Sequence, residues 1–331
     1  MSDAVPLVEV TRGPFVESRH FGHAVIARAN GEVVEAWGDA SKIVLPRSSA
    51  KMIQALPLLE SGAGKHLSQE QLALACASHS GERRHVDKVT AWLSDLGLDE
   101  HALCCGPQAS RDEDLRVDMI RNGIEPTRVF NNCSGKHAGF LTLAKHLGVS
   151  LDYVDTANPV QQAVKAAFED TCGEESPGYG IDGCSAPNFA ASLSGIARAM
   201  ACFAEAGSGT GARETAMVTL RDAMMAHPEL VSGKGRSCAA LMAAARGKAA
   251  VKTGAEGFFV AILPEKKLGV ALKIEDGATR ASEAAMAAIL VRLGVVDADD
   301  PGIARFLSPD IRNWDGLHVG QIRACRAVLD G

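Results

Sequence analysis

The sequence predicts a mixed α/β (α+β) fold, in which strands from both ends of the chain form one antiparallel sheet and a helical segment is inserted between them. Residues 1–47 read as strands, residues 48–246 follow a helical pattern, and the strand pattern returns over 247–331. We therefore expect one domain with two lobes. The sheet lobe takes 1–47 and 247–331, the helical lobe takes 48–246, and a cleft between lobes is the expected site.

The bulk properties exclude several classes of function. The 331 residues carry a net charge of −6 with no basic stripe, which argues against a nucleic-acid partner. The first ten residues, MSDAVPLVEV, have no secretory pattern, and no apolar run approaches about 20 residues, so we expect a cytoplasmic protein without a membrane span. Nine scattered cysteines then predict free thiols or ligands, not a disulfide framework.

Strand and helix signals follow the chain in order. Within residues 23–38, HAVIARANGEVVEAWG, the pair Asn30-Gly31 separates two β-rich runs and predicts a hairpin with a type I′ turn. Further on, Ser68 and Gln71 stand at the spacing of a capping box and predict the start of a helix.

The second half of the helical segment has equally clear boundaries. Asn158 as cap, Pro159 in the first turn and Gly173 as stop delimit one helix. Residues 185–207 form another long helix candidate, followed by a flexible GSGTG at 207–211.

The pattern then returns to strands. Residues 249–277 predict two or three antiparallel strands with short turns, 279–294 predict a helix, and LHVGQIRAC at 317–325 predicts a late strand.

A first chemical motif lies in RSSAK. Ser48 and Lys51 are three residues apart, so on a helix they share a face, and a lysine whose pKa is lowered can take the proton of a serine nucleophile. The alternative is that Ser48 or Ser49 is an N-cap and Lys51 a solvated residue. Pro57 makes any helix here short or kinked.

A second motif, Lys252-Thr253-Gly254, lies on a predicted strand. S-x-x-K followed by K-T-G resembles the paired motifs of serine β-lactamases and penicillin-binding proteins, in which the strand lysine points into the site. The alternative for Lys252 is an edge-strand charge that deters aggregation. Ser80 in SHSGE is interpreted as the second hydroxyl, paired with Lys252, or else as the N-cap of the next helix.

A third constellation combines two cysteine-containing turns. Cys133, Lys136 and His137 stand at a predicted helix start, and Asp182 and Cys184 precede another predicted helix. Thiolates favour zinc, whereas lysine is an unusual ligand because it must lose its proton first. A metal or redox site and a pair of buried thiols both explain these residues.

Together RSSAK, SHSGE, NNCSGKH, DGCSAPN and VKTG resemble the Rhizobium-type L-asparaginase II family over nearly the whole chain. The resemblance implies a serine β-lactamase/glutaminase-like fold, hydrolysis of L-asparagine to L-aspartate and ammonia, and a homodimer. It also implies two serine–lysine pairs, Ser48 with Lys51 and Ser80 with Lys252.

The same resemblance implies zinc, with no organic cofactor, and three further residues at the site. The implied zinc ligands are Cys133, Lys136 and Cys184. The residues implied near the substrate are Arg47, His137 and Asp182. Because two serine–lysine pairs would be superfluous beside a metal-bound hydroxide, we expect zinc to shape the substrate pocket. The alternatives are a β-lactamase-like amidase or esterase with another substrate, and a non-catalytic zinc or thiol protein.

Overall fold

The computed structural model describes residues 3–207, 209 and 211–329, and these fall into two compact units. Unit 1 contains the chain up to Ser49, Ala191–Glu205 and the chain from Ala240 onward. Unit 2 contains Ala50–Ala190 and Ala206–Ala239. In the predicted flexible stretch 207–211, positions 208 and 210 lie outside the described residues.

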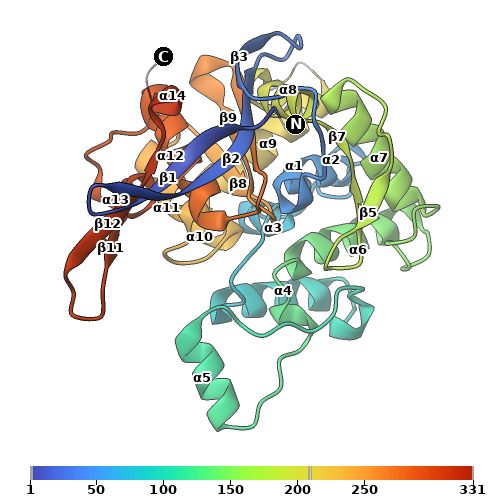
Figure 1. The fold of residues 1–331 in the computed structure, drawn as a ribbon. Coiled ribbons are helices and arrows are strands. Elements are labelled where there is room, and N and C mark those ends of the chain that lie inside the picture. Colours follow the sequence, from blue (N-terminus) through green and yellow to red (C-terminus); the bar gives the residue numbers. More distant parts are fainter. Residues whose placement is uncertain (1–2, 208, 210, 330–331) are drawn as a thin grey trace. The chain divides into compact units, whose positions relative to one another are not determined.

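Unit 1 is built on an antiparallel sheet whose strands come from both ends of the chain. Its order is β11-β12-β1-β2-β10-β9-β8, and β3 pairs with β2 (Figure 1). This sheet, together with the helical segment inserted in the sequence, confirms the predicted fold class. The strands are β1 (Val5–Arg12), β2 (Phe15–Ala27), β3 (Val33–Trp37), β8 (Ala250–Thr253), β9 (Phe258–Leu263), β10 (Leu268–Ile274), β11 (Asp310–Arg312) and β12 (His318–Ala324).

The β2–β3 hairpin forms where it is predicted, but its turn type is different. Gly31 adopts a positive φ of 90° and Asn30 does not, whereas a type I′ turn needs positive φ at both central residues. The Gly31 N–H instead donates to the Arg28 carbonyl at 3.0 Å, and the Arg28 N–H donates to the Glu32 carbonyl. The loop is therefore longer than the two residues that the type I′ prediction assumes.

The middle of the sheet is buried on both faces. Every residue of β9, FFVAIL, is buried, and two helices, α8 (Leu193–Glu205) and α12 (Thr279–Arg292), pack on the sheet. A Cβ on Gly269 of β10 would lie 2.1 Å from the Ala197 carbonyl oxygen of α8. Glycine thus allows the helix to approach this strand closely.

Helix α8 begins eight residues later than predicted, at Leu193 instead of residue 185. The preceding residues form two short strands, β6 (Pro187–Phe189) and β7 (Ala191–Ser192). β7 pairs with β4 (Ile43–Val44), far away in the sequence. Long-range strand pairing therefore overrides the local helical preference of this alanine-rich stretch.

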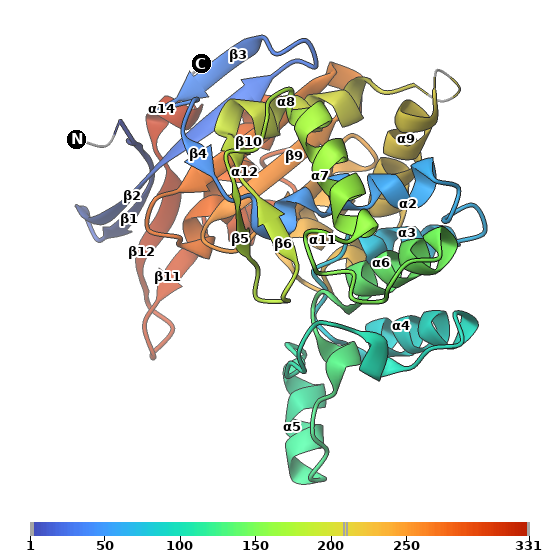
Figure 2. The ribbon, with the colours of Figure 1, turned by 90° about the vertical axis from the view of Figure 1, so that its right-hand side faces the viewer.

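Unit 2 consists mainly of helices, and two of their predicted start signals are confirmed. Ser68 and Gln71 form a reciprocal capping box, Asn158 caps the helix that Pro159 opens, and that helix ends at left-handed Gly173. The helices are α1 (Lys51–Gln54), α2 (Leu56–Glu60), α3 (Gln69–Ala75), α4 (Arg83–Asp95), α5 (Glu113–Arg121), α6 (Ser134–Leu147), α7 (Pro159–Cys172), α9 (Ala212–Ala226) and α10 (Pro228–Val231). Figure 2 shows α5 standing away from α2, α3 and α6 of the same unit.

The remaining helices lie in the last third of the chain. They are α11 (Ser237–Ala245), α13 (Pro301–Leu307) and α14 (Arg326–Leu329). Among the described residues, no helix has the length and apolar character needed to cross a lipid bilayer.

Candidate active site

Lys51 opens α1 and is fully buried within unit 2. Its Nζ donates to the Ala77 carbonyl oxygen at 2.5 Å and to Ser78 Oγ at 2.9 Å, and lies 3.1 Å from Cys133 Sγ. These three contacts hold the amine in place. The structure therefore gives Lys51 a hydroxyl partner, Ser78, that the sequence reasoning did not identify.

The segment before Lys51 does not cap a helix with a serine. Arg47–Ala50 form a 3₁₀ turn, η1, and the N-cap of α1 is Ala50, without a side-chain cap. The capping alternative for Ser48 and Ser49 is thus wrong. Arg47 has a φ of 54°, a left-handed conformation that is uncommon for a residue other than glycine. Such strain is often found at functional sites.

Lys252 lies on β8 in unit 1, next to this same segment. Ser49 Oγ donates to the Lys252 carbonyl oxygen at 2.9 Å, and a Cβ on Gly254 would lie 2.6 Å from the Pro46 carbonyl oxygen. Lys252 is fully buried, with Nζ donating to the Thr253 carbonyl oxygen at 2.8 Å. A charge that deters edge pairing would face solvent, so that alternative does not fit. Within unit 1 the K-T-G strand runs beside residues 46–49.

Ser80 belongs to a loop of unit 2 that is hydrogen-bonded to other segments of the same unit. Ser80 Oγ donates to the Ser232 carbonyl oxygen at 2.9 Å, and the Ser80 carbonyl oxygen accepts from the Arg111 N–H at 2.8 Å. The N-cap of α4 is Glu82. Ser80 is therefore not the cap of this helix, and the structural alternative proposed for it is wrong.

His79, between Ser78 and Ser80, stabilises this loop through hydrogen bonds. Its Nδ1 accepts from the Gly81 N–H at 3.1 Å, and its Nε2 lies 2.9 Å from Ser134 Oγ. Burial, reinforced by the stacked His85 ring, lowers the pKa of His79 well below its ordinary value. The imidazole is therefore neutral near pH 7, as its acceptor role requires.

The two cysteine-containing turns converge within unit 2. Cys133 is the N-cap of α6, as predicted, and Lys136 Nζ lies 3.0 Å from Cys184 Sγ. The neighbouring Cys133 lowers the pKa of Cys184 far below its ordinary value, against the effect of burial, and Lys136 and His137 lower it further. Cys184 is therefore the more acidic of the two thiols. Burial lowers the pKa of Lys136, but the two cysteine sulfurs outweigh it and the net shift is upward.

Cys184 does not precede a helix, contrary to the prediction. It lies at the tip of a hairpin formed by β5 (Tyr179–Ile181) and β6, closed by the Asp182 N–H donating to the Ala186 carbonyl oxygen at 2.9 Å. Ser185 has a φ of 69°. Asp182 is therefore a turn residue and not a helix cap, and its carboxylate contributes to the upward shift of the Lys136 pKa.

His137 lies beside the cysteine pair and is fully buried. Its Nδ1 lies 2.9 Å from the hydroxyl of Tyr153, a buried residue that the sequence reasoning did not identify. Burial lowers the pKa of His137 to about 4, although Cys184 acts in the opposite direction. Within the described chain its Nε2 has no hydrogen-bond partner. The alternative of a surface helix histidine is wrong.

These residues form a donor set that suits zinc only if the lysine takes part. In the described ranges, no three histidine, cysteine, aspartate or glutamate side chains are arranged to hold a metal. Cys133, Cys184 and Lys136 together supply two sulfurs and a nitrogen, which are ligand atoms that zinc accepts. The unpartnered His137 Nε2 is a further nitrogen beside them. The residues present thus fit the metal.

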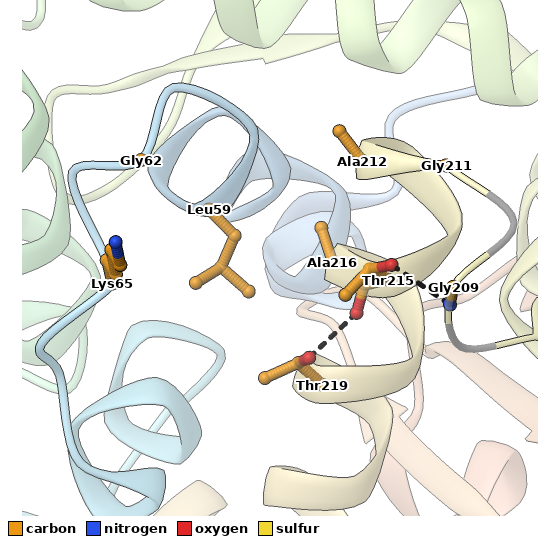
Figure 3. Close-up of a pocket in the computed structure, with 9 residues that line it drawn as sticks. All are labelled: Leu59, Gly62, Lys65, Gly209, Gly211, Ala212, Thr215, Ala216 and Thr219. Atoms are coloured by element: carbon orange, nitrogen blue, oxygen red, sulfur yellow. Dashed lines mark hydrogen bonds between the residues drawn. The ribbon is translucent and has the colours of Figure 1, made fainter.

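A separate pocket of about 460 Å³ lies in unit 2 (Figure 3). Leu59, Lys65 and the α9 residues Thr215 and Thr219 contribute to its lining, and Thr219 Oγ1 donates to the Thr215 carbonyl oxygen at 2.7 Å. None of the predicted site residues lines it.

The decisive comparison concerns the sequence as a whole. A family model described as L-asparaginase II matches residues 8–324. The chain belongs to the L-asparaginase II family. The resemblance drawn from the five motifs is thereby confirmed, and membership of the L-asparaginase II family supports hydrolase activity. No curated protein sequence matches the chain significantly.

Solved structures similar to this L-asparaginase II family member are distant in sequence. Mglu in its tris and glutamate form shares 12% identity and a TM-score of 0.48, covering 89% of this chain and 64% of that one. A β-lactamase/D-alanine carboxypeptidase from Pseudomonas syringae shares 12% identity and a TM-score of 0.40, covering 79% and 90%. A class C β-lactamase mutant shares 13% identity and a TM-score of 0.40, covering 86% and 91%. The chain spans less than two thirds of Mglu.

Proposed function

We propose that the chain hydrolyses L-asparagine to L-aspartate and ammonia through a serine nucleophile and a lysine base. One observation supports the role of Lys51 as the base. Its side chain is fully buried, contacts only uncharged oxygens and a cysteine sulfur, and has no carboxylate partner among the described residues. A buried lysine that serves only stability is normally paired with a carboxylate. Membership of the L-asparaginase II family supports the substrate.

In the proposed reaction Ser48 Oγ attacks the side-chain amide carbon of asparagine, while Lys51 accepts the hydroxyl proton. The C–N bond then breaks, and the departing nitrogen takes a proton and leaves as ammonia. Water hydrolyses the aspartyl ester by the same route and frees Ser48. Ser80 and Lys252 orient the amide or transfer protons. In an alternative version of this mechanism, Ser80 attacks the amide carbon in place of Ser48.

The substrate's charged ends need complementary groups. Arg47 offers a bidentate donor fork to the α-carboxylate, and Asp182 a carboxylate to the α-ammonium. His137, neutral at pH 7 because burial lowers its pKa to about 4, offers an uncharged nitrogen to the substrate or to a water.

Cys133, Cys184 and Lys136 would hold zinc. When bound, zinc would supply a fixed positive charge that shapes the substrate pocket. The contact of Cys133 with Lys51 supports an influence of this centre on the serine chemistry. The homodimer implied by the resemblance stays a prediction. A measurement of the molar mass of the protein in solution tests it.

The test compares Ser48→Ala and Ser80→Ala, both loaded with zinc, by ammonia release from asparagine. We expect Ser48→Ala to lose at least 10³-fold in kcat, as removal of an activated nucleophile does, and Ser80→Ala to lose less. The reverse order would make Ser80 the nucleophile. Substantial activity in both variants would discard serine chemistry.

A substrate panel tests the specificity. Asparagine should be hydrolysed faster than glutamine, a chromogenic lactam or a simple ester. Preference for the lactam or ester would favour the amidase or esterase alternative. If the zinc-bound protein turned over none of these four compounds, the alternative of a non-catalytic zinc or thiol protein would be favoured.

A further inference from the structure

A small cavity in unit 2 is lined in part by Lys136, one of the proposed metal ligands. Its volume is about 10 Å³, and most of its walls are apolar side chains, including Phe140 and Leu143. Two polar residues also line it, Gln54 from α1 and Lys136 from α6. About 10–15 Å³ of such volume is what one water molecule needs.

Gln54 is the unexplained polar group of this region. Its side chain is 93% buried (7% exposed), and its Oε1 has no hydrogen-bond partner within the described residues. Leaving a buried acceptor unsatisfied costs about 1–3 kcal/mol. A partner placed in the cavity that Gln54 lines would remove this cost.

Lys136 is the complementary group on the other wall. Its Nζ contacts Cys184 Sγ at 3.0 Å and lies 5.3 Å from the centre of the Phe140 ring. One N–H directed to the sulfur leaves others that need an acceptor. The cavity is lined by both Lys136 and Gln54.

We propose that the cavity holds one water molecule that accepts a hydrogen bond from Lys136 Nζ and donates one to Gln54 Oε1, and that Gln54 thereby orients the amine toward Cys184. Gln54 is a positioning residue for the metal centre. This inference rests on the zinc site of the proposed function. It assigns a role in metal affinity to a glutamine that none of the sequence motifs includes.

Outer-sphere groups that orient a ligand typically change metal affinity by 10- to 100-fold. Methionine matches the volume of glutamine but cannot accept the hydrogen bond, while glutamate keeps an acceptor oxygen in nearly the same place. Leu143→Met is a matched control, because it alters the same cavity wall without touching a polar group.

The experiment measures Zn²⁺ dissociation constants by competition with a chromogenic chelator for the wild type, Gln54→Met, Gln54→Glu and Leu143→Met. We expect Gln54→Met to bind Zn²⁺ at least tenfold more weakly, and Gln54→Glu and Leu143→Met to stay within threefold of the wild type. The ligand-field spectrum of the Co²⁺-substituted protein should shift in Gln54→Met only. A purely structural glutamine would move neither readout.

Two outcomes overturn the inference in different ways. Equal Zn²⁺ affinity and an unchanged Co²⁺ spectrum in Gln54→Met would remove Gln54 from the metal centre while leaving the proposed zinc site intact. A wild type that binds no Zn²⁺ would remove both. Thermal melting of the metal-free variants separates misfolding from weakened binding: Gln54→Met should melt within a few degrees of the wild type.

Discussion

The contact between Ser78 and Lys51 adds a second serine to the predicted Ser48–Lys51 pair. Lys51 directs one N–H to Ser78 Oγ at 2.9 Å, and this hydroxyl can accept from an ammonium or donate to a neutral amine. Unlike a backbone carbonyl, which can only accept, a serine in this position can also donate to the lone pair of the neutral amine.

We predict that Ser78→Ala lowers kcat for asparagine about 10- to 100-fold with little change in KM, because a hydrogen bond to a charged group contributes about 1.5–3 kcal/mol. Ser78→Thr keeps the hydroxyl and should retain most of the activity. The exposed Ser61→Ala is the control. Steady-state kinetics decide: a full kcat in Ser78→Ala would show that Lys51 does not depend on this hydroxyl.

His79 gives a pH dependence whose sign follows from burial. Its pKa in the folded chain lies well below the ordinary 6.5, so below pH 6.5 the unfolded chain binds a proton that the native chain does not. The free energy of unfolding must therefore fall as the pH falls through 6.5, by at most about 1.4 kcal/mol per pH unit for this group.

We predict a steeper loss of stability between pH 7 and 5.5 in the wild type than in His79→Gln, measured by urea unfolding at each pH. His66→Gln, at an exposed position, is the control and should keep the slope of the wild type. Equal slopes in the wild type and His79→Gln would mean that other groups account for the acid sensitivity.

At the scale of elements, strand β8 depends on the absence of a side chain at Gly254. A Cβ there would lie 2.6 Å from the Pro46 carbonyl oxygen and 3.0 Å from Ser49 Oγ. We predict that Gly254→Ala pushes the strand away from residues 46–49, destabilises the fold by about 1–3 kcal/mol and lowers activity.

The control for Gly254→Ala is Gly106→Ala, where a Cβ meets no atom within 4 Å. Urea unfolding and asparagine turnover should separate the two variants clearly. If Gly254→Ala behaved like Gly106→Ala in both measurements, β8 would not need its close approach to this segment.

Elements whose limits are set by local chemistry were predictable. The capping box at Ser68 and the Asn158 and Gly173 boundaries depend on residues two to four positions away, and the sequence displays them directly. The strands at 187–192 were missed because their formation depends on distant partners, such as Ile43–Val44 for β7. Alanine-rich composition alone favours a helix there.

For the molecule as a whole, the motifs predicted the family, but not the contacts of the candidate site residues. Lys51 and Ser78 are 27 residues apart, and no spacing rule connects them. Gln54 and Tyr153 likewise carry no motif; their importance comes from an unpaired oxygen and from a hydroxyl beside His137, both of which are properties of packing.

The sheet of unit 1 also sets the order of events during synthesis. β1 pairs with β12, in the register Val8↔Ala324, and β2 pairs with β10, so β1 and β2 must wait for partner strands that are synthesised much later. Until then β1 and β2 have only each other and β3, with edges open to other chains. We therefore expect chaperone dependence during synthesis to be concentrated in β1, β2 and β3 until β10 and β12 have been made.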